Sequence, residues 1–357
     1  MKVSVLGCGN VGVAIAADLS KKGHEVSLVK TSSNKSDVLD TIRHDRKRVF
    51  LYEDGWYSES TIGEISFDLS SIRSSDVIFV TIQSTYHEEL IRKIAPHVHS
   101  GQIIVVVCSY MSSFFFRKYC KDIPTIVETA GPYLEGRTDL KDVDGSVVFR
   151  VGCRLNRSPL SIFQPQDGNA VMGVIRQLYG GFSNDYSTME CALLNPNMVI
   201  HTVGSIMSIP RIEFSDGNFC MYREAYSHKN EATLKVMTAL DEEKKSVLSS
   251  LGCNPVDIFV SGGFATDRFD KWGGFFRYSE SEDRAISPTS VRSRYIIEDV
   301  SQGLVFLESV AGLSGVSVPV ASSLITIASN ALGVDFRSEG RTVERLGAGE
   351  YVNSFLG

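Results

Sequence analysis

Three glycines near the start of the chain have the spacing of a phosphate-binding turn. Their pattern, G-x-G-x-x-G, lies between a β-branched run at 2–6 and a helical apolar pattern at 11–20. The first glycine permits the tight turn, the second lets a pyrophosphate approach the backbone, and the third lets the helix pack on the strand. The N–H groups at the start of the helix then face the negative charge. The residues expected to bind a dinucleotide here are Gly7, Gly9, Asn10, Val11 and Gly12.

The end of the second predicted strand indicates which dinucleotide is bound. In NAD-binding folds a carboxylate at this place accepts a hydrogen bond from the ribose 2′-OH. Here the chain continues with Lys30, Thr31, Ser32 and Ser33, which offer a cation and three hydroxyls. These groups suit a 2′-phosphate, so we expect Lys30, Thr31 and Ser32 to favour NADP(H) over NAD(H). The alternative is that Lys30 points to solvent and that the site accepts either cofactor.

Two further loops follow strand-like runs whose carboxyl ends are expected at one edge of the sheet. Gln83 begins the loop 83–85, and the loop 109–111 follows another apolar run. Ligands of doubly wound folds bind outside the carboxyl ends of the parallel strands. We therefore expect these loops to border the nicotinamide ring, with Gln83 as a contact of the cofactor.

A histidine is the expected acid for such a cofactor's chemistry. Reduction of a C=O or C=N bond needs an acid near the reacting atom, and a cation suits a substrate carboxylate. The chain has seven histidines; His87 and His201 adjoin apolar segments, whereas most of the others lie in polar surroundings. Spacing alone does not select one of them.

Strand-sized apolar runs alternate with helical patterns in the first half of the chain. The runs are 2–6, 25–30, 76–82, 102–108, 125–128 and 146–151. Strands this uniformly apolar are covered on both faces, as in parallel sheets, and helical segments such as 86–94 lie between them. The alternation predicts a Rossmann-type, doubly wound α/β domain.

The second half of the chain has the pattern of an all-helical domain. The segment 231–251 has one apolar face and is followed by Gly252, while Pro319 and Gly333 bracket another helical segment. Proline at the start and glycine just past the end are typical of helix termini. The change of pattern near residue 180 predicts domains at 1–182 and 183–357.

Length and composition narrow the function classes. The 357 residues suit two soluble domains, and the longest apolar runs fall short of the roughly 18 residues of a membrane-spanning helix. A net charge of −6 without a long basic run argues against nucleic-acid binding. Seven cysteines without a C-x-x-C pair indicate neither disulfides nor a zinc site, and no metal is expected. The first residues lack a signal-peptide pattern, which favours a cytoplasmic location.

Several motifs together resemble the octopine/opine dehydrogenase family. The clearest are 195–201 (NPNMVIH), 294–305 and 335–347; the segments 221–224 and 239–243 also agree with the family's pattern. With the N-terminal glycine motif, the resemblance spans nearly the whole chain. It implies reductive condensation of an amino acid with an α-keto acid, most commonly pyruvate, to a secondary-amine dicarboxylate.

The resemblance also implies roles for individual residues. His201 corresponds to the family's catalytic histidine, Asp299 to the acid paired with it, and Arg294 to a ligand of a substrate carboxylate; Thr129, of a Glu-Thr pair, is a weaker candidate on the keto-acid side. A carboxylate can fix the tautomer of an imidazole and favour its protonated form. On a regular helix, however, Arg294 and Asp299 diverge by about 140°, so both reach one site only at a helix end.

Some departures from the family pattern keep other functions open. Thr202 stands where many relatives have proline, and the loop 108–113, usually rich in glycine and proline, is CSYMSS. A 2-keto-acid reductase resembling ketopantoate reductase and a catalytically silent nucleotide sensor are the alternatives. The expected partners are a small amino acid and an α-keto acid, with neither nucleic acid nor membrane; a homodimer stays open, because composition does not decide the oligomeric state.

Overall fold

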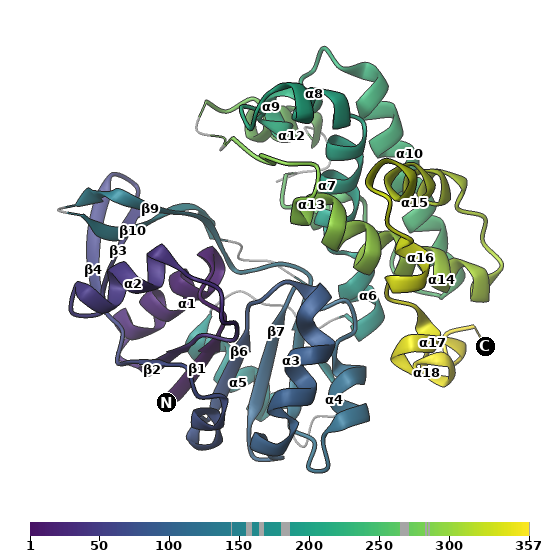
Figure 1. Ribbon diagram of the computed structural model, residues 1–357. Helices are drawn as coiled ribbons and strands as arrows, with labels where there is room; N and C mark the ends of the chain where they lie inside the picture. Colours follow the sequence, from purple (N-terminus) through teal and green to yellow (C-terminus); the bar gives the residue numbers. More distant parts are fainter. Residues whose placement is uncertain are drawn as a thin grey trace. The chain divides into compact units, whose positions relative to one another are not determined.

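The computed structural model describes residues 1–143, 145–154, 159–163, 168–179, 186–264, 271–282, 284 and 286–356. The chain divides into two units, Met1–Thr188 and Met189–Gly357, and each is described by itself (Figure 1). The predicted boundary between residues 182 and 183 lies outside the described residues.

A seven-stranded sheet forms the centre of the first unit, with the strand order β11-β8-β7-β6-β1-β2-β5. Its strands are β1 (Lys2–Leu6), β2 (Glu25–Val29), β5 (Glu64–Ser66), β6 (Val77–Val80), β7 (Ile103–Val107), β8 (Thr125–Thr129) and β11 (Leu160–Phe163). Every pairing is parallel except that of β11 with β8. The chain order reverses between β1 and β6, so the predicted doubly wound Rossmann-type fold is confirmed.

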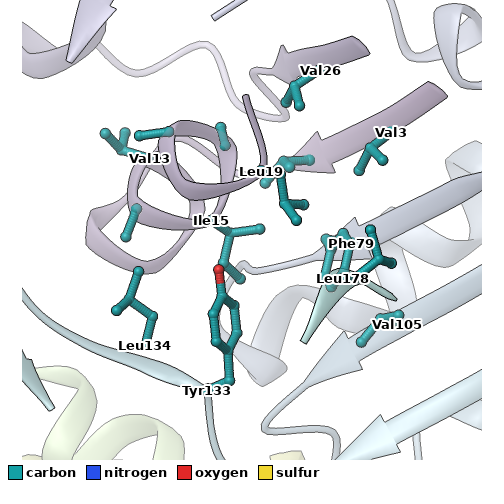
Figure 2. Packing of buried hydrophobic residues seen from close by; sticks show 14 of the residues in the cluster. Val3, Val13, Ile15, Leu19, Val26, Phe79, Val105, Tyr133, Leu134 and Leu178 are labelled. Atoms are coloured by element: carbon teal, nitrogen blue, oxygen red, sulfur yellow. The ribbon is translucent and has the colours of Figure 1, made fainter. Parts of the chain in front are cut away.

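The helices of this unit are α1 (Asn10–Lys21), α2 (Asp37–His44), α3 (His87–Ile94), α4 (Ser113–Tyr119) and α5 (Gly168–Leu178), with short 3₁₀ turns η1 (Leu69–Ser74), η2 (Ser84–Tyr86) and η3 (Ala95–His97). Helices α1, α3 and α4 connect successive parallel strands, whereas α2 leads to a second sheet and α5 follows the last strand. Helix α1 is buried on nearly all sides. In Figure 2 Ile15 of this helix lies beside Tyr133, and Leu19 faces the strands of the large sheet. The Gly-rich turn is therefore fixed by a helix that has little freedom to move.

A second sheet covers the outer face of α1 and corrects one prediction. Its order is β4-β3-β10-β9, with β3 (Arg48–Glu53), β4 (Trp56–Thr61), β9 (Leu134–Val143) and β10 (Ser146–Arg154). The run 146–151, predicted for the large sheet, belongs here, because β10 pairs with β3 and β9. The Asp54-Gly55 turn between β3 and β4 has positive φ at both residues, which is typical of a two-residue hairpin.

The second unit is helical, as predicted. Its helices are α6 (Thr188–Leu193), α7 (Asn197–Ile206), α8 (Ile209–Phe214), α9 (Met221–Ala225), α10 (Glu231–Ser250), α11 (Ile258–Ser261), α12 (Lys271–Ser279), α13 (Arg294–Glu298), the π-helix η4 (Asp299–Leu304), α14 (Val305–Ser314), α15 (Pro319–Leu332), α16 (Phe336–Glu339), α17 (Val343–Leu346) and α18 (Gly349–Asn353). Gly333 ends α15 in the left-handed conformation, as the sequence indicated. In the described part of the chain, no helix has the length and apolar character needed to cross a membrane.

Candidate functional site

The glycine turn after β1 has the geometry that a dinucleotide site requires. Gly7 has a φ of 118°, which residues with a side chain rarely adopt. A Cβ at Gly12 would overlap the carbonyl oxygen of Gly7, so only glycine lets α1 approach the strand this closely. A Cβ at Gly9, by contrast, would meet nothing within 4 Å. The backbone is thus open at Gly9, where a pyrophosphate is expected to lie.

The start of α1 offers backbone N–H groups. Gly9 is the N-cap, no side chain caps the helix, and its first turn contains no acidic residue. The side chain of Asn10 is turned to the neighbouring sheet, where its Oδ1 accepts from the N–H of Thr138 at 3.2 Å and from the Thr138 hydroxyl at 2.5 Å. Asn10 and the half-buried Val11 therefore offer their main chain to a ligand. These residues suit a pyrophosphate at the helix start.

The end of β2 places a cation next to this turn. The Nζ of Lys30 lies 3.4 Å from the hydroxyl of Ser32. Thr31, which separates the two residues in the sequence, is half-buried. Burial raises the pKa of the Cys8 thiol to about 12, and the nearby ammonium of Lys30 acts in the opposite direction. Cys8 is thus a neutral thiol, and Lys30 lies close enough to the glycine turn to act on it electrostatically.

Two other predicted site residues belong to the first unit: Gln83 follows β6, and Thr129 is the last residue of β8. Gln83 is exposed and precedes the 3₁₀ turn η2. Thr129 is 2% exposed, and its hydroxyl donates to the carbonyl of Gly131 at 2.8 Å. Both lie at carboxyl ends of parallel strands, which is where this fold binds its ligands.

The second unit brings together two predicted residues that are 98 positions apart. The Nδ1 of His201 on α7 lies 2.8 Å from the Oδ2 of Asp299 in η4, and both side chains are almost fully buried. A carboxylate at Nδ1 accepts the proton held there, which leaves Nε2 as the nitrogen that can exchange a proton. The phenol oxygen of Tyr222 lies 3.4 Å from this Nε2.

Tyr295 holds the imidazole from its face. The rings of Tyr295 and His201 stack with centroids 3.8 Å apart and planes inclined by 5°. Arg294 precedes Tyr295 as the first residue of α13, and its guanidinium carbon lies 5.8 Å from the centre of the Tyr295 ring. The side chain of Arg294 is 44% exposed, and one of its guanidinium nitrogens lies 3.7 Å from Oε2 of the buried Glu298. Arg294 therefore lies at a helix end and keeps contact with solvent.

Close helix packing explains how Tyr222 reaches the histidine. Gly204 on α7 lies against α9, and a Cβ there would lie 2.7 Å from the Tyr226 ring and 2.8 Å from Met221. The hydroxyl of Tyr226 donates to the carbonyl of Ile200, which fixes α9 further. Because α9 comes this close to α7, Tyr222 lies beside the imidazole.

A π-helix carries Asp299, and a distant loop supports it. In a π-helix such as η4 the backbone hydrogen bonds span five residues rather than four, which widens the helical turn. The carbonyl of Ser301 accepts from the backbone N–H of Arg341 at 2.8 Å. A Cβ at Gly340 would lie 2.7 Å from the same oxygen, so glycine is needed for this approach. The segment around Gly340 thereby supports the helical turn that presents Asp299.

The predicted site residues thus form two groups. The cofactor residues and Thr129 belong to the first unit, whereas His201, Asp299 and Arg294 belong to the second. Tyr222 and Tyr295 were not predicted from the sequence, although both lie in segments that resemble the family's pattern. An aromatic residue next to Arg294 was the available signal, since flat rings commonly stack on histidine.

Sequence profiles of known families match both units. The family described as NAD/NADP octopine/nopaline dehydrogenase, alpha-helical domain, matches residues 185–332, and ketopantoate reductase PanE/ApbA matches residues 3–108. Among curated proteins, an opine dehydrogenase of Arthrobacter sp. (strain 1C) is 24% identical, over 96% of this chain and 94% of the relative. A vitopine synthase of Allorhizobium ampelinum is 23% identical, over 98% of this chain and 96% of the relative.

Solved structures share the fold. Octopine dehydrogenase in complex with NADH and L-arginine has a TM-score of 0.74 at 20% identity, over 97% of this chain and 96% of that one. Yersinopine dehydrogenase with bound NADP⁺ has a TM-score of 0.68 at 13% identity, over 100% of this chain and 95% of that one. At these identities the likeness shows the fold, and the match covers 95% or more of each chain.

Proposed function

Because the chain belongs to the octopine/opine dehydrogenase family of NAD(P)-dependent oxidoreductases, we propose that it condenses an amino acid with an α-keto acid and reduces the product. The amine and the keto group lose water to give an imine, and hydride addition with one proton gives a secondary-amine dicarboxylate. Pyruvate is the proposed keto acid. A relative in this family, octopine dehydrogenase, has been solved with pyruvate and with L-arginine.

The buried pair of His201 and Asp299 carries this proposal. A bound NAD(P)H would supply the hydride. His201 is proposed to deliver the proton from Nε2, because Asp299 holds the Nδ1 proton and so selects the tautomer. The carboxylate also stabilises the imidazolium, and the stacked ring of Tyr295 keeps the imidazole in one plane. The hydroxyl of Tyr222 lies 3.4 Å from the nitrogen that exchanges the proton.

Two residues are proposed to hold the substrates. Arg294 can bind a carboxylate through two parallel hydrogen bonds, and its partial exposure leaves the guanidinium accessible to a ligand. Thr129 is the candidate on the keto-acid side. Its hydroxyl would have to give up the bond to Gly131 in order to donate to a substrate. Arg294 is therefore the better supported of the two.

NADP(H) is the proposed cofactor, bound by Gly7, Gly9, Gly12 and the backbone at 10–11, with Gln83 towards the nicotinamide. Lys30 supports the choice, because its ammonium and the hydroxyl of Ser32 lie together at the end of β2. A cation with a neighbouring hydroxyl suits the 2′-phosphate, whereas a 2′-OH gains little from it.

A 2-keto-acid reductase is the second candidate, because the ketopantoate reductase profile matches the first unit. Such an enzyme would use a lysine as its acid. Lys244 of α10 does not suit this role: its side chain is 1% exposed and its Nζ lies 2.6 Å from Asp241. Burial lowers the pKa of Lys244, while Asp241 opposes this shift. The Lys244 ammonium is therefore buried and paired with a residue of its own helix.

The deciding experiment is NADPH and NADH oxidation by the purified protein with pyruvate alone and with pyruvate plus each amino acid. We expect oxidation only when both substrates are present, together with a product whose mass equals that of the imine plus two hydrogens. Oxidation with a keto acid alone would favour the simple reductase. Cofactor binding without turnover under any condition would favour the nucleotide sensor.

A further inference from the structure

The loop after β7 has an unusual backbone for residues with side chains. Cys108, Tyr110 and Met111 have φ values of 54°, 46° and 60°, so three of four successive residues are left-handed and none is glycine. Left-handed backbone is unfavourable for residues with a Cβ and persists only where the surroundings enforce it. The neighbouring segments must therefore hold this loop in place.

A single buried carboxylate, that of Glu128 on β8, binds the loop at three points. Its Oε2 accepts from the hydroxyl of Ser109 at 2.5 Å and from the N–H of Met111 at 3.1 Å. Its Oε1 accepts from the N–H of Ser113, the first residue of α4, at 2.6 Å. The residue is fully buried, so these hydrogen bonds are not weakened by competing water.

A second contact joins this loop to the end of β6. The hydroxyl of Ser112 lies 2.7 Å from Nδ1 of the buried His87 and donates to the carbonyl of Ser109 at 2.5 Å. The Nε2 of His87 lies 3.2 Å from the carbonyl of Ile82. The segments that follow β6 and β7 are thus connected through buried polar groups.

We propose that Glu128 is a positioning residue, which holds the left-handed segment 108–111 at the carboxyl end of β7 and so shapes the part of the site that takes the nicotinamide. This inference rests on the proposed function. The pyrophosphate is expected at the start of α1 and the adenosine half towards β2, which leaves β6 and β7 for the other half of the cofactor. Glu128 acts through the backbone that it holds.

The test compares the whole cofactor with its adenosine half. In Glu128→Gln one carboxylate oxygen becomes an NH₂ group, which cannot accept a hydrogen bond. At least one of the donors from Ser109, Met111 and Ser113 therefore loses its acceptor, and the loop is released. If the competent loop conformation falls to about a tenth of the population, the Kd of NADPH rises about tenfold. The Kd of 2′-phospho-ADP-ribose, which lacks the nicotinamide, should stay unchanged. NADH and ADP-ribose form the same comparison for the other cofactor.

Glycine provides a rescue that separates positioning from direct contact. Cys108→Gly adopts a positive φ without strain and removes only a half-buried thiol, so Glu128→Gln combined with Cys108→Gly should recover most of the NADPH affinity. Failure of this rescue would overturn the proposal in favour of a direct contact between Glu128 and a ligand. Should Glu128→Gln not fold, Ser109→Ala removes one donor, keeps the charge and is expected to show the same split between NADPH and the fragment.

Other outcomes also decide the matter. Unchanged binding of NADPH by a folded Glu128→Gln protein would overturn the proposal. So would an equal loss for NADPH and 2′-phospho-ADP-ribose, because it would indicate general damage to the first unit. If the unaltered protein binds neither the cofactors nor their fragments, the proposed function itself fails, and that result is distinct from a failure confined to the variant.

Discussion

The ring of Tyr295 lies flat against the imidazole of His201, with the two centroids 3.8 Å apart and the two planes inclined by only 5°. Asp299 meets the same imidazole at its edge, 2.8 Å from Nδ1. One contact fixes the plane of the ring and the other fixes its rotation within that plane. Because both partners belong to one continuous helical segment, α13 and η4, the orientation of His201 depends on that segment.

Loss of the stacked ring should reduce turnover. Tyr295→Leu removes the stack, and we expect kcat/KM to fall about fivefold, since such ring contacts contribute about 1 kcal/mol. Tyr295→Phe keeps the ring and should stay close to the unaltered enzyme. Steady-state kinetics with both substrates measures the difference. Equal losses in the two variants would instead assign the effect to the phenol hydroxyl.

Asp299→Asn tests the partner of the histidine. The neutral amide no longer stabilises an imidazolium or selects one tautomer, so kcat should fall by about two to four orders of magnitude. The Kd of the cofactor should not change, because the glycine turn belongs to the other unit. Glu231→Gln, an exposed change in the helical unit, serves as the control. A kcat close to normal for Asp299→Asn would contradict the role of the pair.

Gly340→Ala tests the support of the π-helix. The added methyl would clash with the carbonyl oxygen of Phe336, would lie 2.7 Å from that of Ser301 and would disturb the bond between Ser301 and the Arg341 N–H. We expect the free energy of unfolding to fall by about 1–3 kcal/mol and kcat to fall with it. Gly312→Ala on α14 is the matched control, because its Cβ would meet nothing within 4 Å. Urea unfolding and kinetics check both variants; normal kcat for Gly340→Ala would separate η4 from catalysis.

Alanine substitutions at Gly9 and at Gly12 should affect different properties of the protein. Gly9→Ala places a methyl in open space, so stability should hold while cofactor affinity falls, because a pyrophosphate can no longer approach. Gly12→Ala forces α1 away from the Gly7 carbonyl and should lower the thermal unfolding temperature. Calorimetry and cofactor titration on the same samples distinguish the two effects. Full affinity in Gly9→Ala would place the pyrophosphate elsewhere.

Lys30→Ala tests the choice of cofactor. Loss of a charge-assisted contact with the 2′-phosphate should raise the KM for NADPH about tenfold or more, while the KM for NADH changes little. The exposed Lys35, altered to alanine, controls for a general loss of positive charge. Equal effects on both cofactors would mean that Lys30 does not recognise the 2′-phosphate.

The sequence by itself determined the features that depend on near neighbours in the chain. The glycine spacing after β1, the alternation of strands and helices, and the glycine at the end of α15 are local patterns, and local backbone conformation follows from them. The Asp54-Gly55 turn carried a local signal of the same kind. The strands beside it, RVFLYE and WYSEST, carry charged and hydroxyl side chains and therefore differ from the uniformly apolar runs of the large sheet.

Tertiary structure alone decided the contacts between distant segments. His201 and Asp299 lie 98 residues apart, and nothing in their spacing places one at the Nδ1 of the other. The carbonyl of Ser301 in the π-helix meets the segment of Gly340 and Arg341, and this contact depends on packing between segments far apart in the chain. The left-handed loop at 108–111 likewise forms against its residues' own preferences, because the carboxylate of Glu128 on the neighbouring strand outweighs them.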